Sequence, residues 1–167
     1  MLLIREQDFF SNVTYVLNIN IVKDNLSLKN SKIMTSKVIY IGDLRCESEH
    51  LQSGTNIITD APTDNHGKGA AFSPTDLCAT SLAQCMLTTI AILGKDKGIE
   101  IEGAYAEVQK NMNPKPRKIA EIVCDLYFPK NFSDADKKFI EETAMNCPVA
   151  LSLSSELKKT VSFHYKN

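Results

Sequence analysis

The feature that most constrains this chain is a long apolar segment that opens with a strong helix-start signal. Ser73 is suited to accept a backbone N–H as the N-cap, and Pro74 fits the first helical position. Asp76 completes a weaker form of the capping box. Gly98 suits the left-handed position that ends a helix, so the sequence predicts a helix from Ser73 to about Lys97.

Apolar side chains cover most of the circumference of this predicted helix, so we expect protein to surround it. These positions are Leu77, Cys78, Leu82, Cys85, Met86, Leu87, Ile90 and Leu93. The stretch from Ala79 to Leu93 is interrupted by polar residues and falls short of the roughly 18 apolar residues of a membrane span. A buried helix of a globular domain, without a membrane as partner, is therefore expected.

Short alternating or β-rich runs on both sides of the helix predict an α+β fold. The expected strands are Lys37–Ile41, Arg45–Leu51, Asn56–Asp60, Gly103–Lys110, Lys118–Phe128 and Lys159–Tyr165, with a loop over 111–117, a helix from Ser133 to Asn146 and another from Cys147-Pro148. In the strand ending at Phe128, the apolar residues fall on one face. The order is three strands, the long helix, two strands, two helices and a strand.

Residues 1–33 differ from the rest, because they are Asn-rich, irregular in hydrophobic period and free of Gly and Pro. A poorly ordered extension and an added edge strand at Val13–Val22 are equally compatible with this composition. A biological start at Met34 is a third possibility. We therefore expect an N-terminal extension of uncertain order over 1–33 and one domain over 34–167.

Composition and charge bear on the partners and the cellular compartment to be expected. The 167 residues are 43% hydrophobic, and 19 Lys and Arg against 20 Asp and Glu give a net charge of −1, which offers no general attraction for nucleic acid or anionic lipid. The five cysteines are odd in number, widely spaced and without a C-x-x-C motif, which favours a reducing compartment. The N-terminus lacks the pattern of a signal peptide, so a cytoplasmic location is expected.

Local context separates the cysteines, because a thiol becomes nucleophilic only where its thiolate is stabilised. Cys147 precedes Pro148 at a predicted helix N-terminus, which favours an anion. Cys85 lies too deep in its helix for this effect and needs a cation from elsewhere, for which Arg45 and Arg117 are candidates. On residues alone, however, core filler is the commoner role of a cysteine in an apolar helix.

The remaining candidates carry weaker signals. Cys78 and Cys85 lie two helical turns apart, about 10 Å, and are too far apart for a disulfide. Cys124 is expected in the core and Cys46 in a structural role. Cys46 and His50 lack a second pair of metal ligands, and Gly67-Lys68-Gly69 lacks the spacing of a phosphate-binding loop. The sequence gives no reason for His66 or His164 to act as a base for Cys85. No metal or cofactor is expected.

Two separated motifs now bear on the family. The stretch FSPTDLCATSLAQCMLTTI over residues 72–90 and the stretch NCPVA over 146–150 each place a cysteine at a defined point of a helix. Together with the element order from Met34 to Tyr165, they resemble the OsmC/Ohr family of osmotically inducible and organic hydroperoxide resistance proteins. The resemblance implies antiparallel sheets packed on a long central helix and an intertwined homodimer with its sites at the subunit interface.

The resemblance also implies roles for three residues. Cys85 would be the peroxidatic cysteine, Cys147 the resolving cysteine that forms a disulfide with it, and Arg45 the arginine that supports the thiolate. The expected function is thiol-dependent reduction of organic hydroperoxides. A small lipophilic hydroperoxide and an external dithiol would then be the partners, besides the second subunit.

One position departs from the family pattern. Thr75 stands where the characterised hydroperoxide reductases have a glutamate paired with the arginine. Asp76 is adjacent, but its side chain is turned by about 100° around the helix, and a helix cap is its expected role. The Ser-Pro-Thr-Asp-Leu form resembles an OsmC-like subgroup of uncertain substrate. The alternative function is therefore a non-catalytic stress protein that binds a small lipophilic ligand at the dimer interface.

Overall fold

A computed structural model describes residues 34–166. The expected extension over 1–33, with the strand considered at Val13–Val22, lies outside the described residues. The chain divides into two compact units, of which one comprises residues 39–47 with 57–167 and the other includes residues 34–38 and 48–56.

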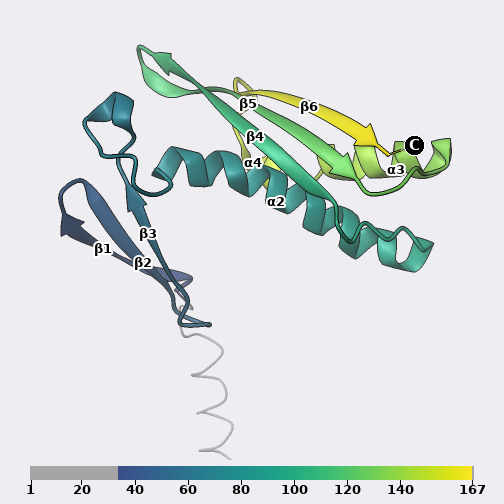
Figure 1. The fold of residues 1–167 in the computed structure, drawn as a ribbon, viewed down its shortest axis with the longest axis horizontal. Coiled ribbons are helices and arrows are strands. Elements are labelled where there is room, and N and C mark those ends of the chain that lie inside the picture. The colour runs from purple at the N-terminus through teal and green to yellow at the C-terminus, as the bar shows by residue number, and fades with distance from the viewer. Residues whose placement is uncertain (1–33, 167) are drawn as a thin grey trace, which may run out of the picture. The chain divides into compact units, whose positions relative to one another are not determined.

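The observed elements follow the expected α+β order (Figure 1). They are β1 (Ser36–Gly42), β2 (Arg45–His50), β3 (Asn56–Asp60), η1 (Thr63–Asn65), α2 (Pro74–Gly94), η2 (Lys95–Lys97), β4 (Tyr105–Pro114), β5 (Arg117–Phe128), α3 (Asp134–Met145), α4 (Pro148–Ser152) and β6 (Lys158–Tyr165). The strands form two three-stranded sheets, in the orders β1-β2-β3 and β4-β5-β6.

Helix α2 begins and ends as its sequence predicts. The Ser73 hydroxyl accepts a hydrogen bond from the Asp76 N–H at 3.1 Å, and the Asp76 carboxylate accepts from the Ser73 N–H at 2.8 Å, so the full capping box is present. At the other end the last turn tightens into the 3₁₀ helix η2, and Gly98 follows with φ 70°.

One side of α2 is buried within the chain. Leu82, Met86 and Ile90 are fully buried, whereas Ile92 is 71% exposed and Leu93 is 53% exposed. Residues 34–166 therefore cover one side of the helix and leave these two apolar side chains exposed. Its apolar residues outnumber the positions that the described chain covers.

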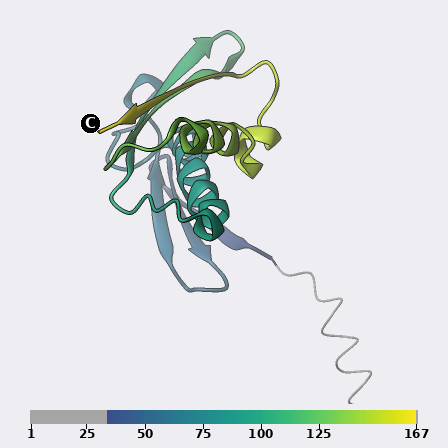
Figure 2. The ribbon, with the colours of Figure 1, turned by 90° about the vertical axis from the view of Figure 1, so that its right-hand side faces the viewer.

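The stretch from Pro74 to Lys97 has the length and composition of a membrane-spanning helix. The expected core helix over Ala79–Leu93 is part of this longer stretch. Core helices of globular domains pass the same test, and α2 packs against α3, α4 and the strands β4 and β5 (Figure 2). This packing identifies it as a core helix.

The second sheet combines both kinds of strand pairing. β4 and β5 are antiparallel, with Tyr105 opposite Tyr127 and Pro114 opposite Arg117. β5 and β6 are parallel, so this sheet is not purely antiparallel as expected. The physical reason is the connection, because α3 and α4 lie between β5 and β6 in the chain and return it in the same direction.

The hairpin between β4 and β5 is tighter than predicted. The expected loop over 111–117 is wrong, because β4 continues to Pro114 and β5 starts at Arg117. A register shift between Asn111 and Met112 lets the ladder continue. Pro114 is tolerated because β4 is an edge strand.

The core lies between α2 and the inner face of the second sheet. The predicted alternation in β5 is confirmed, since its inward residues are all buried and its outward ones are only half-buried. The inward residues are Ile122, Cys124, Leu126 and Phe128. Ile140 of α3 and Leu157, which precedes β6, close the same cluster.

Candidate functional site

Cys85 lies in the middle of α2, on the flank of the buried stripe. Its side chain is half-buried and packs against the core cluster. Its sulfur lies 3.9 Å from the Thr89 hydroxyl, one turn further along the helix. Cys85 is thus partly accessible to solvent, whereas Cys147 is buried.

Cys147 is the N-cap of α4, where its sulfur accepts a hydrogen bond from the Ala150 N–H at 3.5 Å. The predicted helix start is confirmed, but the expected activation is not. Burial raises the pKa of Cys147, and the neighbouring Cys85 thiol acts in the same direction. The N–H groups of Ala150 and Val149 oppose this shift without overcoming it. Cys147 is therefore a protonated thiol at neutral pH.

The structure brings Cys85 and Cys147 near each other, because α2 packs against α4 and Cys85 packs against the core cluster that contains Cys147. Both are free thiols. Two adjacent thiols of unequal accessibility suit a cycle between dithiol and disulfide, in which the more exposed one meets the oxidant and the buried one completes the bond. No geometric argument from sequence alone predicts this proximity.

The other three cysteines stand apart from this chemistry. Cys124 is fully buried in β5, and burial raises its pKa to about 11, so it has the inert core role expected of it. Cys46 and Cys78 are half-buried free thiols. Cys46 lines a small cavity of about 260 Å³ with Thr75 and Arg117.

Arg45, the candidate supporting cation, lies at the start of β2. Among the described residues it makes no hydrogen bond with Cys85, and its Nε is buried without a hydrogen-bond partner. Arg117, the other candidate, is bound elsewhere, since its guanidinium donates two hydrogen bonds of 3.1 Å to the Asp64 carboxylate. The described chain therefore brings the two thiols together but does not bring an arginine to them.

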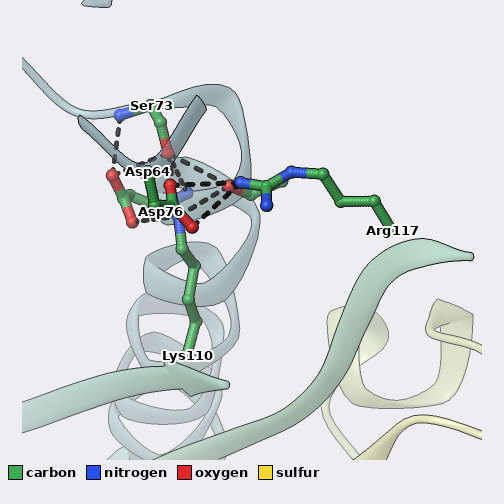
Figure 3. A network of polar contacts seen from close by, with 6 residues as sticks. Asp64, Ser73, Asp76, Lys110 and Arg117 are labelled. Atoms are coloured by element: carbon green, nitrogen blue, oxygen red, sulfur yellow. Dashed lines mark hydrogen bonds and ion pairs between the residues drawn. The ribbon is translucent and has the colours of Figure 1, made fainter. Parts of the chain in front are cut away.

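A polar network that the sequence analysis missed surrounds the start of α2 (Figure 3). The Lys110 ammonium donates to the Ser73 hydroxyl at 3.0 Å and to the Thr75 hydroxyl at 2.6 Å, and it pairs with the Asp76 carboxylate at 2.6 Å. The Lys110 side chain is only 15% exposed. The available signal was its position, because Lys110 continues the inward-facing alternation of Ala106 and Val108 in β4.

The network settles the roles of Thr75 and Asp76. Burial alone raises the pKa of Asp76, but the hydrogen bonds from Lys110 and Ser73 outweigh it and leave that pKa below its usual value. One carboxylate oxygen of Asp76 is taken by the cap and the other by Lys110. Asp76 is thus a helix cap, as expected, and Thr75 accepts a hydrogen bond from a lysine.

The remaining candidate ligands do not assemble. Within residues 34–166, no group of three or more His, Cys, Asp or Glu side chains is placed to hold a metal. His164 hydrogen-bonds Asp125 at 3.2 Å, and His66 is an exposed loop residue after η1. The candidate site therefore consists of Cys85 and Cys147, with Arg45 as a separate cation whose Nε has no hydrogen-bond partner among residues 34–166.

Comparison with known proteins identifies the family. The profile described as "OsmC-like protein" matches residues 66–162. A solved structure from Psychrobacter arcticus 273-4, described as an osmotic stress induced and detoxification response protein, is 49% identical. It covers 80% of this chain and 98% of its own, with a TM-score of 0.77. This chain belongs to the OsmC family.

Other OsmC-like structures share the fold at lower identity. The organic hydroperoxide resistance protein OsmC from Legionella pneumophila is 17% identical with a TM-score of 0.62, and covers 80% of this chain and 99% of its own. The organic hydroperoxide resistance protein OhrB of Bacillus subtilis is 15% identical with a TM-score of 0.58, and covers 78% and 98%. No curated protein matches the chain significantly. At these identities the likeness extends to the fold alone.

Proposed function

We propose that this OsmC-family protein reduces organic hydroperoxides with the thiol pair Cys85 and Cys147. The observation that carries the proposal is the proximity of a half-buried thiol on α2 to a fully buried one at the start of α4, within one packed cluster. Similar structures from Legionella pneumophila and Bacillus subtilis are described as organic hydroperoxide resistance proteins. The proposal thus joins a redox-capable thiol pair to a role in peroxide stress.

The reaction follows from the unequal burial of the two sulfurs. The Cys85 thiolate attacks the O–O bond of the hydroperoxide, forming an S–O bond while the leaving alkoxide takes a proton and departs as an alcohol. Cys147 then attacks the Cys85 sulfenic acid, an S–S bond forms, and the hydroxide leaves as water with the Cys147 proton. An external dithiol restores both thiols by two exchange steps and becomes a disulfide itself.

Arg45 is the proposed cation of this reaction, in a homodimer. A guanidinium near Cys85 favours its thiolate, and the buried Nε–H of Arg45 has no hydrogen-bond partner among the described residues. Since Arg45 does not contact Cys85 within one described chain, we propose that the second subunit brings them together. Apolar strand β1 supplies a surface for that subunit, because its apolar residues are 46% to 64% exposed. These residues are Val38, Ile39, Tyr40 and Ile41.

A second candidate function is non-catalytic binding of a lipophilic ligand at the dimer interface. It is favoured by the polar network at the start of α2, where Lys110 donates a hydrogen bond to the Thr75 hydroxyl and pairs with the Asp76 carboxylate. Neither Thr75 nor Asp76 therefore offers a free acid that could orient an arginine. In this case the thiols would be retained without turnover. We place the protein in the cytoplasm, where a reducing environment keeps such thiols available.

The decisive experiment is consumption of an organic hydroperoxide in the presence of a dithiol. We expect Cys85→Ser to abolish turnover and Cys147→Ser to allow a single oxidation of Cys85 without recycling by disulfide formation. Cys78→Ser is the matched control, because Cys78 lies two turns earlier on the same helix and is also half-buried. Wild-type protein without turnover, or an active Cys85→Ser variant, would overturn the proposal and favour the binding function.

A further inference from the structure

Arg45 and Asp60 face each other across the hairpin of β2 and β3. The Ala61 N–H donates to the Leu44 carbonyl at 3.1 Å, which fixes the register at this end of the two strands. The next pair inward is Arg45 with Asp60, which is a non-hydrogen-bonded pair of the antiparallel ladder. The side chains of such a pair lie closer together than those of a hydrogen-bonded pair. Opposed residues of an antiparallel pair project to the same face, so Arg45 and Asp60 share one face, and Leu44 and Ala61, which alternate with them, line the small cavity.

Within the part of the chain that the structure describes, each of the two side chains has one buried polar atom without a hydrogen-bond partner. Asp60 is 1% exposed, and one of its oxygens, Oδ2, accepts a hydrogen bond from the Ala70 N–H at 2.9 Å. Its other oxygen, Oδ1, has no partner in the described chain, and neither has Nε of Arg45. Buried hydrogen-bonding atoms are paired in nearly all folded proteins, and unpaired ones are costly when their group is charged.

The two orphan atoms are chemically complementary, because one is a guanidinium N–H donor and the other a carboxylate acceptor. We propose that Asp60 is the positioning residue of Arg45, with its Oδ1 accepting the Nε–H of the guanidinium. In the described chain the two groups lie on neighbouring strands without this bond, and rotation of the flexible Arg45 side chain forms it. The two terminal nitrogens of Arg45 then stay available for a thiolate.

The other acids near the start of α2 are already engaged. Asp76 is bound to Ser73 and Lys110, and Asp64 is bound to Arg117. Asp60 is the acid that retains a buried oxygen without a partner among residues 34–166. It therefore takes the place of the acid that is missing at Thr75. This consequence for catalysis rests on the proposed function, whereas the hydrogen bond itself does not.

Nuclear magnetic resonance of the arginine Nε–H groups tests the hydrogen bond directly. In wild-type protein labelled with ¹⁵N-arginine, we expect the Arg45 Nε–H, assigned by its loss in Arg45→Lys, to exchange with solvent at least tenfold more slowly than a free arginine side chain. Asp60→Asn should restore fast exchange, because an amide is a weaker acceptor than a carboxylate. Asp64→Asn is the matched control and should affect Arg117 alone.

Kinetics then tests whether the hydrogen bond positions the arginine. We expect Asp60→Asn to lower kcat/KM about tenfold and to shift the pH dependence of Cys85 alkylation toward higher pH. Asp60→Asn should add no further loss in an Arg45→Lys background, because residues that act through one interaction are not additive. Asp64→Asn should leave kcat/KM within twofold of wild type.

Each outcome decides the proposal. Fast exchange of the Arg45 Nε–H in wild-type protein would overturn it, and this measurement needs no variant that folds less well. Unchanged exchange in Asp60→Asn, or a full additional loss in the Arg45→Lys background, would overturn it as well. A wild-type protein without peroxidase activity would instead refute the proposed function and leave the exchange result to decide the role of Asp60.

Discussion

The two sheets of this protein differ in how completely the described chain buries their apolar side chains. Every second residue of β5 from Ile122 to Phe128 is buried in the core. In β1, six of the seven residues are exposed, including four large apolar ones. Both strands are rich in β-branched and aromatic residues, so strand propensity does not separate them. The difference shows that the second sheet buries its apolar face within the described chain, whereas the apolar residues of β1 stay exposed there.

The largest effect should come from the buried sheet. Leu126→Ala removes a fully buried side chain of β5 and should lower the free energy of unfolding by about 2 to 5 kcal/mol. Val38→Ala in β1, at a side chain 61% exposed, should lower it by less than about 1 kcal/mol at concentrations where the chain is monomeric. Urea unfolding followed by circular dichroism measures both. Equal losses would show that the two sheets are equally buried in solution.

The exposed sheet should instead control assembly. Val38→Glu places a charge in the apolar strand and should dissociate the proposed homodimer, because a charge is costly to bury in an interface. The fold itself should persist, since Val38 contributes little to the core. Sedimentation velocity at several concentrations measures the change. Lys37→Glu, at the neighbouring exposed position, is the control and should leave assembly intact; a wild-type monomer would contradict the dimer.

A smaller effect is expected at the edge of the buried sheet. Lys110→Met removes the cation that binds Ser73, Thr75 and Asp76, and should cost about 1 to 3 kcal/mol because the partners lose their donor. Lys118→Met is the control, since its ion pair with Glu156 is exposed and should contribute less than about 1 kcal/mol. Thermal unfolding of both variants measures the contrast. Equal losses would refute a special role for the network.

The smallest effect should come from the outer face of the same sheet. Hydrogen bonds from Lys158, Thr160 and Asn111 lower the pKa of Glu121 to about 2 from an unfolded value of 4.5. A depressed folded-state pKa stabilises the protein above pH 4.5, and this contribution is lost as the pH falls toward 2. Glu121→Gln should therefore flatten the dependence of the unfolding midpoint on pH between 5 and 2. An identical dependence in both proteins would show that this carboxylate is not coupled to folding.

The sequence predicted much of the fold because its strongest signals are local. The cap at Ser73, the stop at Gly98 and the start at Ser133 depend on residues within a turn or two, and all three are confirmed. The buried face of β5 was predictable because alternation along a strand is also local. The hairpin at Pro114 was not, because whether a strand pairs past a proline depends on its register with a partner.

For the candidate site, Cys85 and Cys147 were predicted from the family motifs. Their positions, one in the middle of a helix and one at a helix start, were predicted from the helix signals around them. The raised pKa of Cys147 did not follow, because desolvation depends on everything that covers the sulfur and here outweighs the helix N-terminus. The hydrogen bonds of Lys110 could not be predicted from the sequence for a related reason. Its partners lie on another element, and only the packing of β4 against α2 brings them within reach.

By itself the sequence determined where the helices begin, which face of β5 is buried and which cysteines sit at helix positions typical of the OsmC family. Capping, alternation and motif spacing are short-range properties, so they are written in consecutive residues. Only the tertiary structure decided that Cys85 and Cys147 share one cluster and that Lys110 donates to the Thr75 hydroxyl. It also decided that Arg45 and Asp60 have buried atoms without partners among residues 34–166. These contacts join residues far apart in the chain, and they depend on strand register, connection and burial, which no local pattern specifies.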